Sequence, residues 1–143
     1  RVLMIECNPV VAALLDDGLR RARQMETLAP IAARIHLLSG NALDHLPALT
    51  EQPEVLYLDP MFPERSKTAK VKHDLRLLQL LYQKTEKPEQ LLRAALSLQA
   101  KKVVVKRPLK GPFLAGRPPS YSLKGKAVRF DVYLGSGKEG VDS

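Results

Sequence analysis

The residues of this chain that are best placed to do chemistry follow the apolar run Val55–Leu58. Asp59, Pro60, Met61 and Phe62 come directly after that run. A buried parallel strand that ends in this way delivers an acid, a rigid turn and an aromatic ring to the crevice at the edge of a sheet. The carboxylate could accept hydrogen bonds there and stabilise positive charge, and the ring could stack on a planar base. The alternative is a capping aspartate in an ordinary Asp-Pro turn.

A second acid stands at the end of another apolar run. Glu6 follows Val2–Ile5 and is followed by Cys7, Asn8 and Pro9. An asparagine before a proline is typical of a helix N-terminus, and the apolar spacing predicts a helix over about 9–24. Strand, acid and capped helix therefore occur in that order.

The rest of the chain alternates in the same manner. We expect a strand within 31–39, a break at Gly40-Asn41, a short helix over 43–49, and helices from 71 to about 84 and from Pro88. A β-branched strand over 102–106, a Pro- and Gly-rich loop over 108–120 and a hairpin around Gly125 follow. This order predicts an α/β fold with a mostly parallel sheet and a C-terminal antiparallel hairpin.

Charge is divided unevenly along the chain, whose formal net charge is +8. Residues 1–60 carry 5 Lys or Arg against 8 Asp or Glu, whereas residues 61–143 carry 18 against 7. The basic half begins beside Asp59, which favours a polyanionic partner such as nucleic acid over a merely solvated basic surface. The basic side chains near the motif and at the end of the strand over 102–106 are Arg65, Lys67, Lys70, Lys72, Arg76, Lys106 and Arg107.

Composition excludes several classes of protein. With 143 residues, 45 % of them apolar, the chain has the size of one domain with its own core. No apolar run approaches the roughly 20 residues that span a bilayer, and no Cys/His cluster suggests a metal site. The lone Cys7 fits a cytoplasmic protein. Because the chain begins inside a strand at Arg1, we expect it to be a piece of a longer protein.

Four blocks of sequence resemble one family. These are Glu6 to Leu19, Tyr57 to Pro63, Val103 to Pro108 and Arg129 to Tyr133. Together they are similar to the bacterial RsmJ family of class I S-adenosylmethionine-dependent methyltransferases, although Met61 stands where the related Asp-Pro-Pro-aromatic signature has a second proline. The resemblance implies methylation of the exocyclic amine of a guanine in small-subunit ribosomal RNA, with the RNA or the small subunit as partner.

The resemblance also implies a Rossmann-like sheet in a single partial domain over 1–143. Its first strand and glycine-rich loop would lie outside this chain, because the only Gly-x-Gly, at Gly135, has no helix after it. Independently of the resemblance, we expect residues 135–143 to be a frayed tail.

By the same resemblance, Glu6 would bind the ribose hydroxyls of S-adenosylmethionine, Cys7 would flank the cofactor, and Asn41 and Ala42 would contact adenine. The alternatives are a surface acid near a helix N-terminus, a packed thiol and an ordinary turn after Gly40.

A guanine amine is a poor nucleophile because its lone pair is delocalised into the ring. Asp59 and the carbonyl of Pro60 could hold the amine hydrogens, so that the lone pair points at the methyl carbon, although Asp59 could instead bind cofactor. Phe62 could stack on a base turned out of its helix, or it could belong to the core. The basic residues Arg65, Lys67, Lys70, Lys72, Lys106 and Arg107 would then contact RNA phosphates.

Two other functions fit the same residues. A DNA amino-methyltransferase shares the Asp-Pro-x-Phe signature, and a non-catalytic RNA-binding domain could keep this fold and charge. Only the enzymes must bind S-adenosylmethionine.

Overall fold

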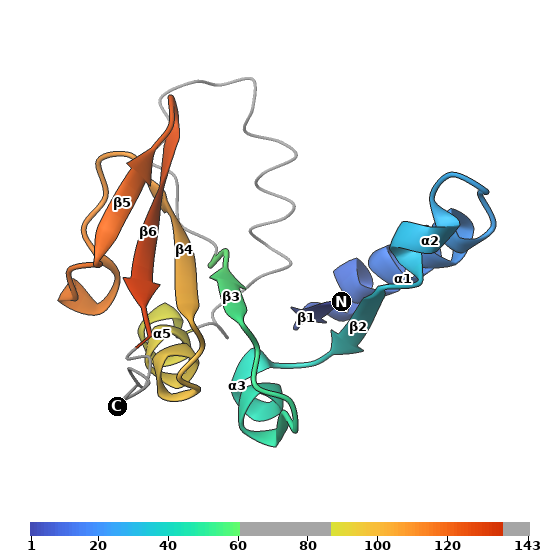
Figure 1. Cartoon of the computed structure of the whole chain (residues 1–143), viewed down its shortest axis with the longest axis horizontal. Helices are drawn as coiled ribbons and strands as arrows, with labels where there is room; N and C mark the ends of the chain where they lie inside the picture. The colour runs from blue at the N-terminus through green and yellow to red at the C-terminus, as the bar shows by residue number, and fades with distance from the viewer. Residues whose placement is uncertain (61–86, 136–143) are drawn as a thin grey trace, which may run out of the picture. The chain divides into compact units, whose positions relative to one another are not determined.

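The computed structural model describes residues 1–60 and 87–135, whose contacts fall into two compact units, 1–48 and 49–143 (Figure 1). The predicted α/β fold is confirmed, with parallel strand pairs and a C-terminal antiparallel hairpin. That residues 1–143 form a single domain stays a prediction.

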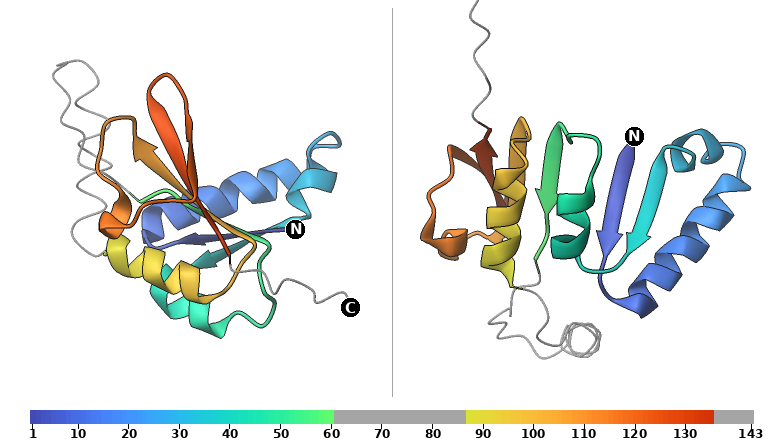
Figure 2. Two further views of the ribbon diagram at one scale, coloured as in Figure 1. Left: turned by 60° about the vertical axis from the view of Figure 1, so that its left-hand side comes forward. Right: turned by 90° about the horizontal axis from the view of Figure 1, so that it is seen from below.

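The first unit is a two-stranded parallel sheet with helices. Its elements are β1 (Val2–Glu6), α1 (Pro9–Arg23), α2 (Ala29–Ala32), β2 (Ile35–Ser39), α3 (Ala42–His45) and η1 (Leu46–Ala48). The predicted helix start is confirmed, because Oδ1 of Asn8 accepts hydrogen bonds from the backbone N–H groups of Val10 and Val11 at 2.9 and 3.1 Å. In both views of Figure 2, α1 runs alongside β1 and β2.

The second unit is a four-stranded sheet covered by a helix. Its elements are β3 (Val55–Leu58), α5 (Pro88–Ser97), β4 (Lys102–Pro108), η2 (Leu114–Gly116), β5 (Tyr121–Lys124) and β6 (Val128–Leu134). The strand order is β3-β4-β6-β5, with β3 and β4 parallel and the later pairs antiparallel. The hairpin therefore returns its second strand, β6, to the side of β4.

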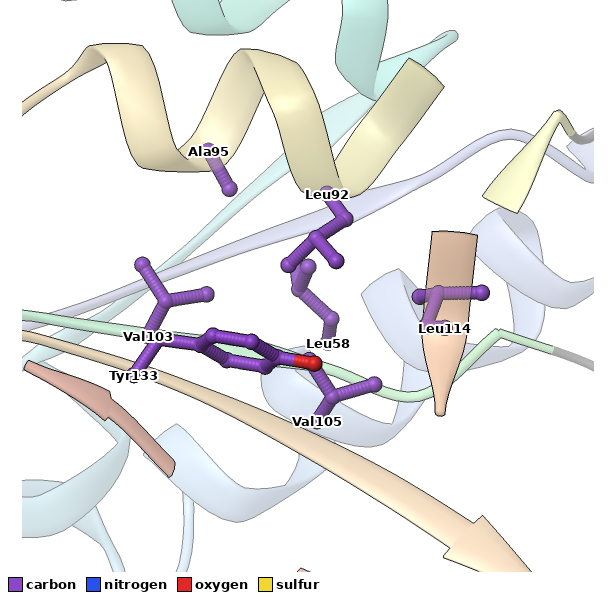
Figure 3. Close-up of a cluster of buried hydrophobic side chains, with 7 residues drawn as sticks. All are labelled: Leu58, Leu92, Ala95, Val103, Val105, Leu114 and Tyr133. Atoms are coloured by element: carbon purple, nitrogen blue, oxygen red, sulfur yellow. The ribbon is translucent and has the colours of Figure 1, made fainter. Parts of the chain in front are cut away.

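One face of that sheet forms the core of the second unit. Alternate residues of β4 point to it, so that Val103 and Val105 are buried while their neighbours are not. Figure 3 shows them packed against α5 and η2, in the cluster Leu58, Leu92, Ala95, Val103, Val105, Leu114 and Tyr133. This burial holds β3 and β4 in the register that aligns their carboxyl ends.

Three local expectations differ from the structure. The helix expected over 43–49 is α3 followed by a 3-10 turn, because Pro47 has no N–H to continue the α-helical pattern. The strand expected over 102–106 continues to Pro108, because β6 pairs with it that far. Gly135, expected in the tail, donates its N–H to the carbonyl of Lys101 at 3.0 Å. The helix expected over 71–84 and the rest of the tail lie outside the described residues.

Candidate active site

The first unit brings Glu6 and Asn41 to the same sheet edge. Glu6 pairs with Ser39 at the carboxyl ends of β1 and β2, and its carbonyl accepts the N–H of Gly40 at 2.9 Å. Oε1 of Glu6 also accepts the backbone N–H of Asn8 at 2.7 Å, which orients the half-buried carboxylate at the start of α1. A carboxylate held at this edge has the acceptor chemistry that ribose hydroxyls require.

The turn beside Glu6 depends on a glycine. Gly40 has a φ of +140°, and a Cβ on it would lie 2.6 Å from Nε2 of His45. Asn41 then starts α3, with its Oδ1 accepting the N–H of Leu43 at 2.9 Å. The side chain of Asn41 thus caps a helix, and the adenine contacts expected of Asn41 and the half-buried Ala42 stay a prediction.

The second unit brings Asp59 and Lys106 together. Asp59 directly follows β3, and Lys106 lies near the end of the neighbouring parallel strand β4. Nζ of Lys106 donates to Oδ2 of Asp59 at 3.0 Å, and both side chains are partly exposed, at 40 % and 49 %. Pro60, which follows Asp59, is buried. The carboxylate is therefore held by a cation while it remains accessible from solvent.

The electrostatics around this pair are consistent with the geometry. The hydrogen bond from Lys106 to Asp59, followed by the charge of that carboxylate, raises the pKa of Lys106 above its ordinary value. Partial burial, followed by the charge of Asp59, raises the pKa of Tyr57. The ring of Tyr57 lies 6.5 Å from that of Phe130, centroid to centroid. Lys106 is therefore protonated and positively charged at physiological pH, and the hydroxyl of Tyr57 is neutral.

Arg107 lies in a different environment from its neighbour. Its side chain points to the opposite face of β4 and is only 5 % exposed. Nε donates to the carbonyl of Pro112 at 3.2 Å, and burial, with the nearby charge of Arg129, lowers the pKa of Arg107. The expected phosphate contact of Arg107 is therefore contradicted by its burial, because strand alternation turns it inward where it turns Lys106 outward.

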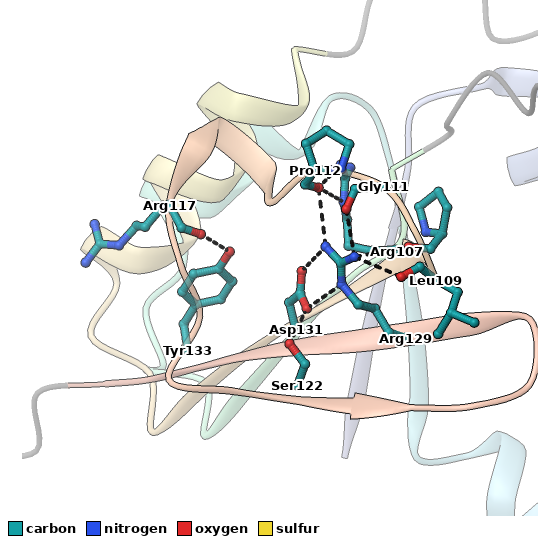
Figure 4. Close-up of polar contacts among 10 residues, drawn as sticks. Arg107, Leu109, Gly111, Pro112, Arg117, Ser122, Arg129, Asp131 and Tyr133 are labelled. Atoms are coloured by element: carbon teal, nitrogen blue, oxygen red, sulfur yellow. Dashed lines mark hydrogen bonds and ion pairs between the residues drawn. The ribbon is translucent and has the colours of Figure 1, made fainter.

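A buried ionic cluster that the sequence did not suggest surrounds Arg107 (Figure 4). Nε of Arg129 lies 2.9 Å from Oδ1 of Asp131, and Ser122 donates to the same oxygen at 2.6 Å. Burial alone would raise the pKa of Asp131, but the hydrogen bonds from Arg129 and Ser122 outweigh burial and lower it. The available signal was the Arg-x-Asp spacing within a strand, which places both side chains on one face.

The remaining expected site residues are Cys7 and a set that follows the Asp-Pro motif. Half-buried Cys7 lies between Glu6, the last residue of β1, and Asn8, the N-cap of α1. The residues that lie outside the described part of the chain are Phe62, Arg65, Lys67, Lys70, Lys72 and Arg76. The roles expected of Cys7 and of this set stay predictions.

Two features are absent from the described part of the chain. No helix within 1–60 and 87–135 is long and apolar enough to cross a membrane. Within the same two ranges, no group of three or more His, Cys, Asp or Glu side chains is arranged to hold a metal ion.

Comparison with known proteins places the chain in a family. The family described as "Putative SAM-dependent methyltransferase" matches residues 1–135. The chain belongs to this family. A solved structure agrees, since a SAM-dependent methyltransferase from Neisseria gonorrhoeae superposes with a TM-score of 0.73 at 38 % identity, over 96 % of this chain and 57 % of that one.

Curated relatives narrow the likeness within the family. The chain is 50 % identical over 135 residues to "Ribosomal RNA small subunit methyltransferase J" of Nitrosococcus oceani, covering 93 % of this chain and 53 % of the relative. It is 50 % identical over 133 residues to the protein of the same name from Pseudomonas aeruginosa, covering 92 % and 51 %. The expected resemblance to the RsmJ family is confirmed, and the chain spans about half the length of these relatives.

Proposed function

We propose that this chain supplies cofactor-binding and catalytic residues of an S-adenosylmethionine-dependent ribosomal RNA methyltransferase. The observation that carries the proposal is the solvent-accessible carboxylate of Asp59 at the end of β3, which is bound by Lys106. The chain that contains it is 50 % identical, over 135 residues, to a small-subunit ribosomal RNA methyltransferase. The proposed acceptor is the exocyclic amine of a guanine, as the resemblance of the Asp-Pro-x-Phe block implies.

Glu6 and its turn fit the cofactor's ribose. The carboxylate is oriented by the N–H of Asn8, and the turn at Gly40 is tied to the same residue, because the N–H of Gly40 donates to the carbonyl of Glu6 at 2.9 Å. Glu6 would accept hydrogen bonds from the ribose hydroxyls, and the backbone after β2 would border the adenine. When bound, S-adenosylmethionine supplies an electrophilic methyl group on a sulfonium sulfur.

Asp59 and Pro60 would prepare the amine. The carboxylate of Asp59 and the carbonyl of Pro60 each accept a hydrogen bond from one N–H group of the amine. This turns the nitrogen lone pair toward the methyl carbon. Glu6 and the backbone after β2 would hold the cofactor, which would give its methyl group to this lone pair and leave as the neutral thioether. The nitrogen then carries a positive charge, which the Asp59 carboxylate stabilises until one amine proton leaves to solvent.

Lys106 would set the position of the carboxylate. Its ammonium holds Oδ2 of Asp59, so the carboxylate cannot swing freely, and the pair costs little because it stays partly solvated. This role differs from the phosphate contact expected of Lys106 from its position alone, and the two roles predict different measurements.

The test is methyl transfer by the full gene product that contains this chain. We expect radiolabelled methyl groups to pass from S-adenosylmethionine to small-subunit ribosomal RNA, with the label in N2-methylguanosine after digestion. Asp59→Ala should lower kcat by on the order of a hundredfold or more while the melting temperature stays unchanged.

Calorimetric titration of S-adenosylmethionine, together with transfer assays on RNA and DNA, distinguishes the proposed enzyme from a DNA amino-methyltransferase and from a non-catalytic RNA-binding domain. Binding without transfer to RNA, but with transfer to DNA adenine or cytosine, would support the DNA amino-methyltransferase. A folded full-length protein that binds RNA and no S-adenosylmethionine would contradict the proposal in favour of a non-catalytic RNA-binding domain.

A further inference from the structure

The loop after β4 is held by several hydrogen bonds from buried side chains. Nη1 of Arg129 donates to the carbonyls of Gly111 and Leu109 at 2.7 and 3.1 Å, and Nη2 donates to that of Pro112 at 3.3 Å (Figure 4). Arg107 donates to the same Pro112 oxygen. Two buried guanidinium groups thus fix the backbone of 109–112, an arrangement that costs desolvation and orders a segment that lacks regular structure.

The far end of the loop has two further anchors. Leu114 is 5 % exposed and packs into the core of the second unit. The hydroxyl of Tyr133 donates to the carbonyl of Arg117 at 2.9 Å. The loop is therefore fixed on both sides of Phe113.

Phe113 is the large apolar side chain that this ordered loop leaves outside. It is 41 % exposed, between the clamped Pro112 and the buried Leu114. The guanidinium carbon of Arg129 lies 5.1 Å from its ring centroid, a cation–π contact that restrains the ring. Its exposure follows from the anchoring of its neighbours.

The position of the loop suggests what the ring contacts. The loop leaves β4 at the carboxyl end, where Lys106 pairs with Asp59 from β3. Exposed Lys110 and Arg117 flank Phe113 along the chain. An exposed ring with exposed cations three and four residues away along the chain is a combination that suits single-stranded nucleic acid, by stacking on bases and attracting the backbone.

We propose that Phe113 is a stacking contact for an unpaired base of the RNA substrate, with Arg129 as the residue that positions it. The proposal rests on the proposed function for the identity of the nucleic acid. It assigns a substrate contact to a loop that lies outside all four sequence blocks that carry the family resemblance.

The test measures the affinity of the full gene product for a short single-stranded, guanine-containing RNA oligonucleotide. Phe113→Leu, which keeps apolar volume but removes the ring, should weaken binding about five- to a hundredfold, and Phe113→Trp should restore it. Tyr121→Leu is the matched control, because Tyr121 is 40 % exposed on β5 and should leave the affinity unchanged.

Two results would overturn the proposal. One is a Phe113→Leu protein that binds the oligonucleotide as tightly as wild type. The other is a Phe113→Leu protein with a lowered melting temperature whose affinity Phe113→Trp does not restore, since that pattern indicates packing. Failure of the proposed function is distinguishable, because it appears as absent methyl transfer in the unsubstituted protein, whatever the RNA affinities.

Discussion

Lys106 and Asp59 form an ion pair across two parallel strands, with Nζ of Lys106 3.0 Å from Oδ2 of Asp59. A second pair, Lys101 and Glu54, joins the other end of the same two strands at 2.8 Å. The side chains of the second pair are far more exposed, at 74 % and 77 %. The Lys101–Glu54 pair is therefore a control for the Lys106–Asp59 pair, because it joins the same two strands at the end away from the proposed active site.

Lys106→Ala should slow methyl transfer without unfolding the protein. Loss of the ammonium frees the Asp59 carboxylate to take other orientations, and mispositioning of this kind lowers kcat by about tenfold to a hundredfold. The melting temperature should hardly change, because partly exposed ion pairs contribute about 0–1 kcal/mol. Lys101→Ala should affect neither quantity. If Lys106→Ala instead raises only the KM for RNA, Lys106 contacts phosphate and does not position Asp59.

Gly40→Ala should impair cofactor binding. The added Cβ meets Nε2 of His45 at 2.6 Å, and a φ of +140° is strained for alanine, so we expect a loss of about 1–3 kcal/mol in the free energy of unfolding. Because Gly40 donates to the carbonyl of Glu6, the affinity for S-adenosylmethionine should fall as well.

Gly18→Ala is the matched control for that substitution. Gly18 lies inside α1, where an added Cβ would meet no atom of the described residues within 4 Å, so alanine should raise helix stability by roughly 0.5–1 kcal/mol. Calorimetry and urea unfolding measure both variants. Equal affinity for S-adenosylmethionine in Gly40→Ala and wild type would remove the Gly40 turn from the proposed site.

Substitutions at Arg107 and Lys110 should have different effects, the first on the stability of the fold and the second on RNA binding. Arg107→Met deprives the carbonyl of Pro112 of the buried donors that Arg107 supplies, which should lower the free energy of unfolding by about 1–3 kcal/mol. Exposed Lys110 has the opposite expectation: Lys110→Ala should leave stability unchanged and lower the salt dependence of RNA binding by about one unit of slope. A reduced salt slope in a stable Arg107→Met protein would restore the phosphate contact that its burial contradicts.

Asp131→Asn should change how stability depends on acid. The lowered pKa of Asp131 in the folded protein means that its contribution is present above the unfolded pKa of about 3.9 and is lost as pH falls through the folded value. At neutral pH the variant should be less stable by about 3 kcal/mol, because Arg129 loses its buried counter-charge. The difference from wild type should narrow as pH drops below about 4.

Asp16→Asn is the control for the acid measurement. Asp16 pairs with Arg20 at 3.4 Å on the surface of α1, where its side chain is 61 % exposed. Urea unfolding across the acid range should show nearly parallel curves for this variant and wild type. A constant difference between Asp131→Asn and wild type at every pH would show that Asp131 acts by packing and not by charge.

Patterns between chain neighbours predict most of the described elements and the position of the Asp-Pro motif. Asn8 caps α1 by bonds to residues two and three positions ahead, so the helix start is visible in a short stretch of chain. The strands β3 and β4 can likewise be predicted from short stretches of chain, the apolar run Val55–Leu58 and the β-branched run from Lys102. These features depend on interactions between chain neighbours, which composition and spacing record.

The contacts between side chains of different strands depend on tertiary pairing. Lys106 and Arg107 look alike as neighbouring basic residues, but the pairing of β4 with β3 and β6 sends one to Asp59 and the other into a buried cluster. The pairing of Arg129 with Asp131 and the carbonyls of the 109–112 loop likewise requires β6 to return beside β4. Which face is buried, and which distant residue lies opposite, depends on the register of strands far apart in the chain, and local sequence does not encode that register.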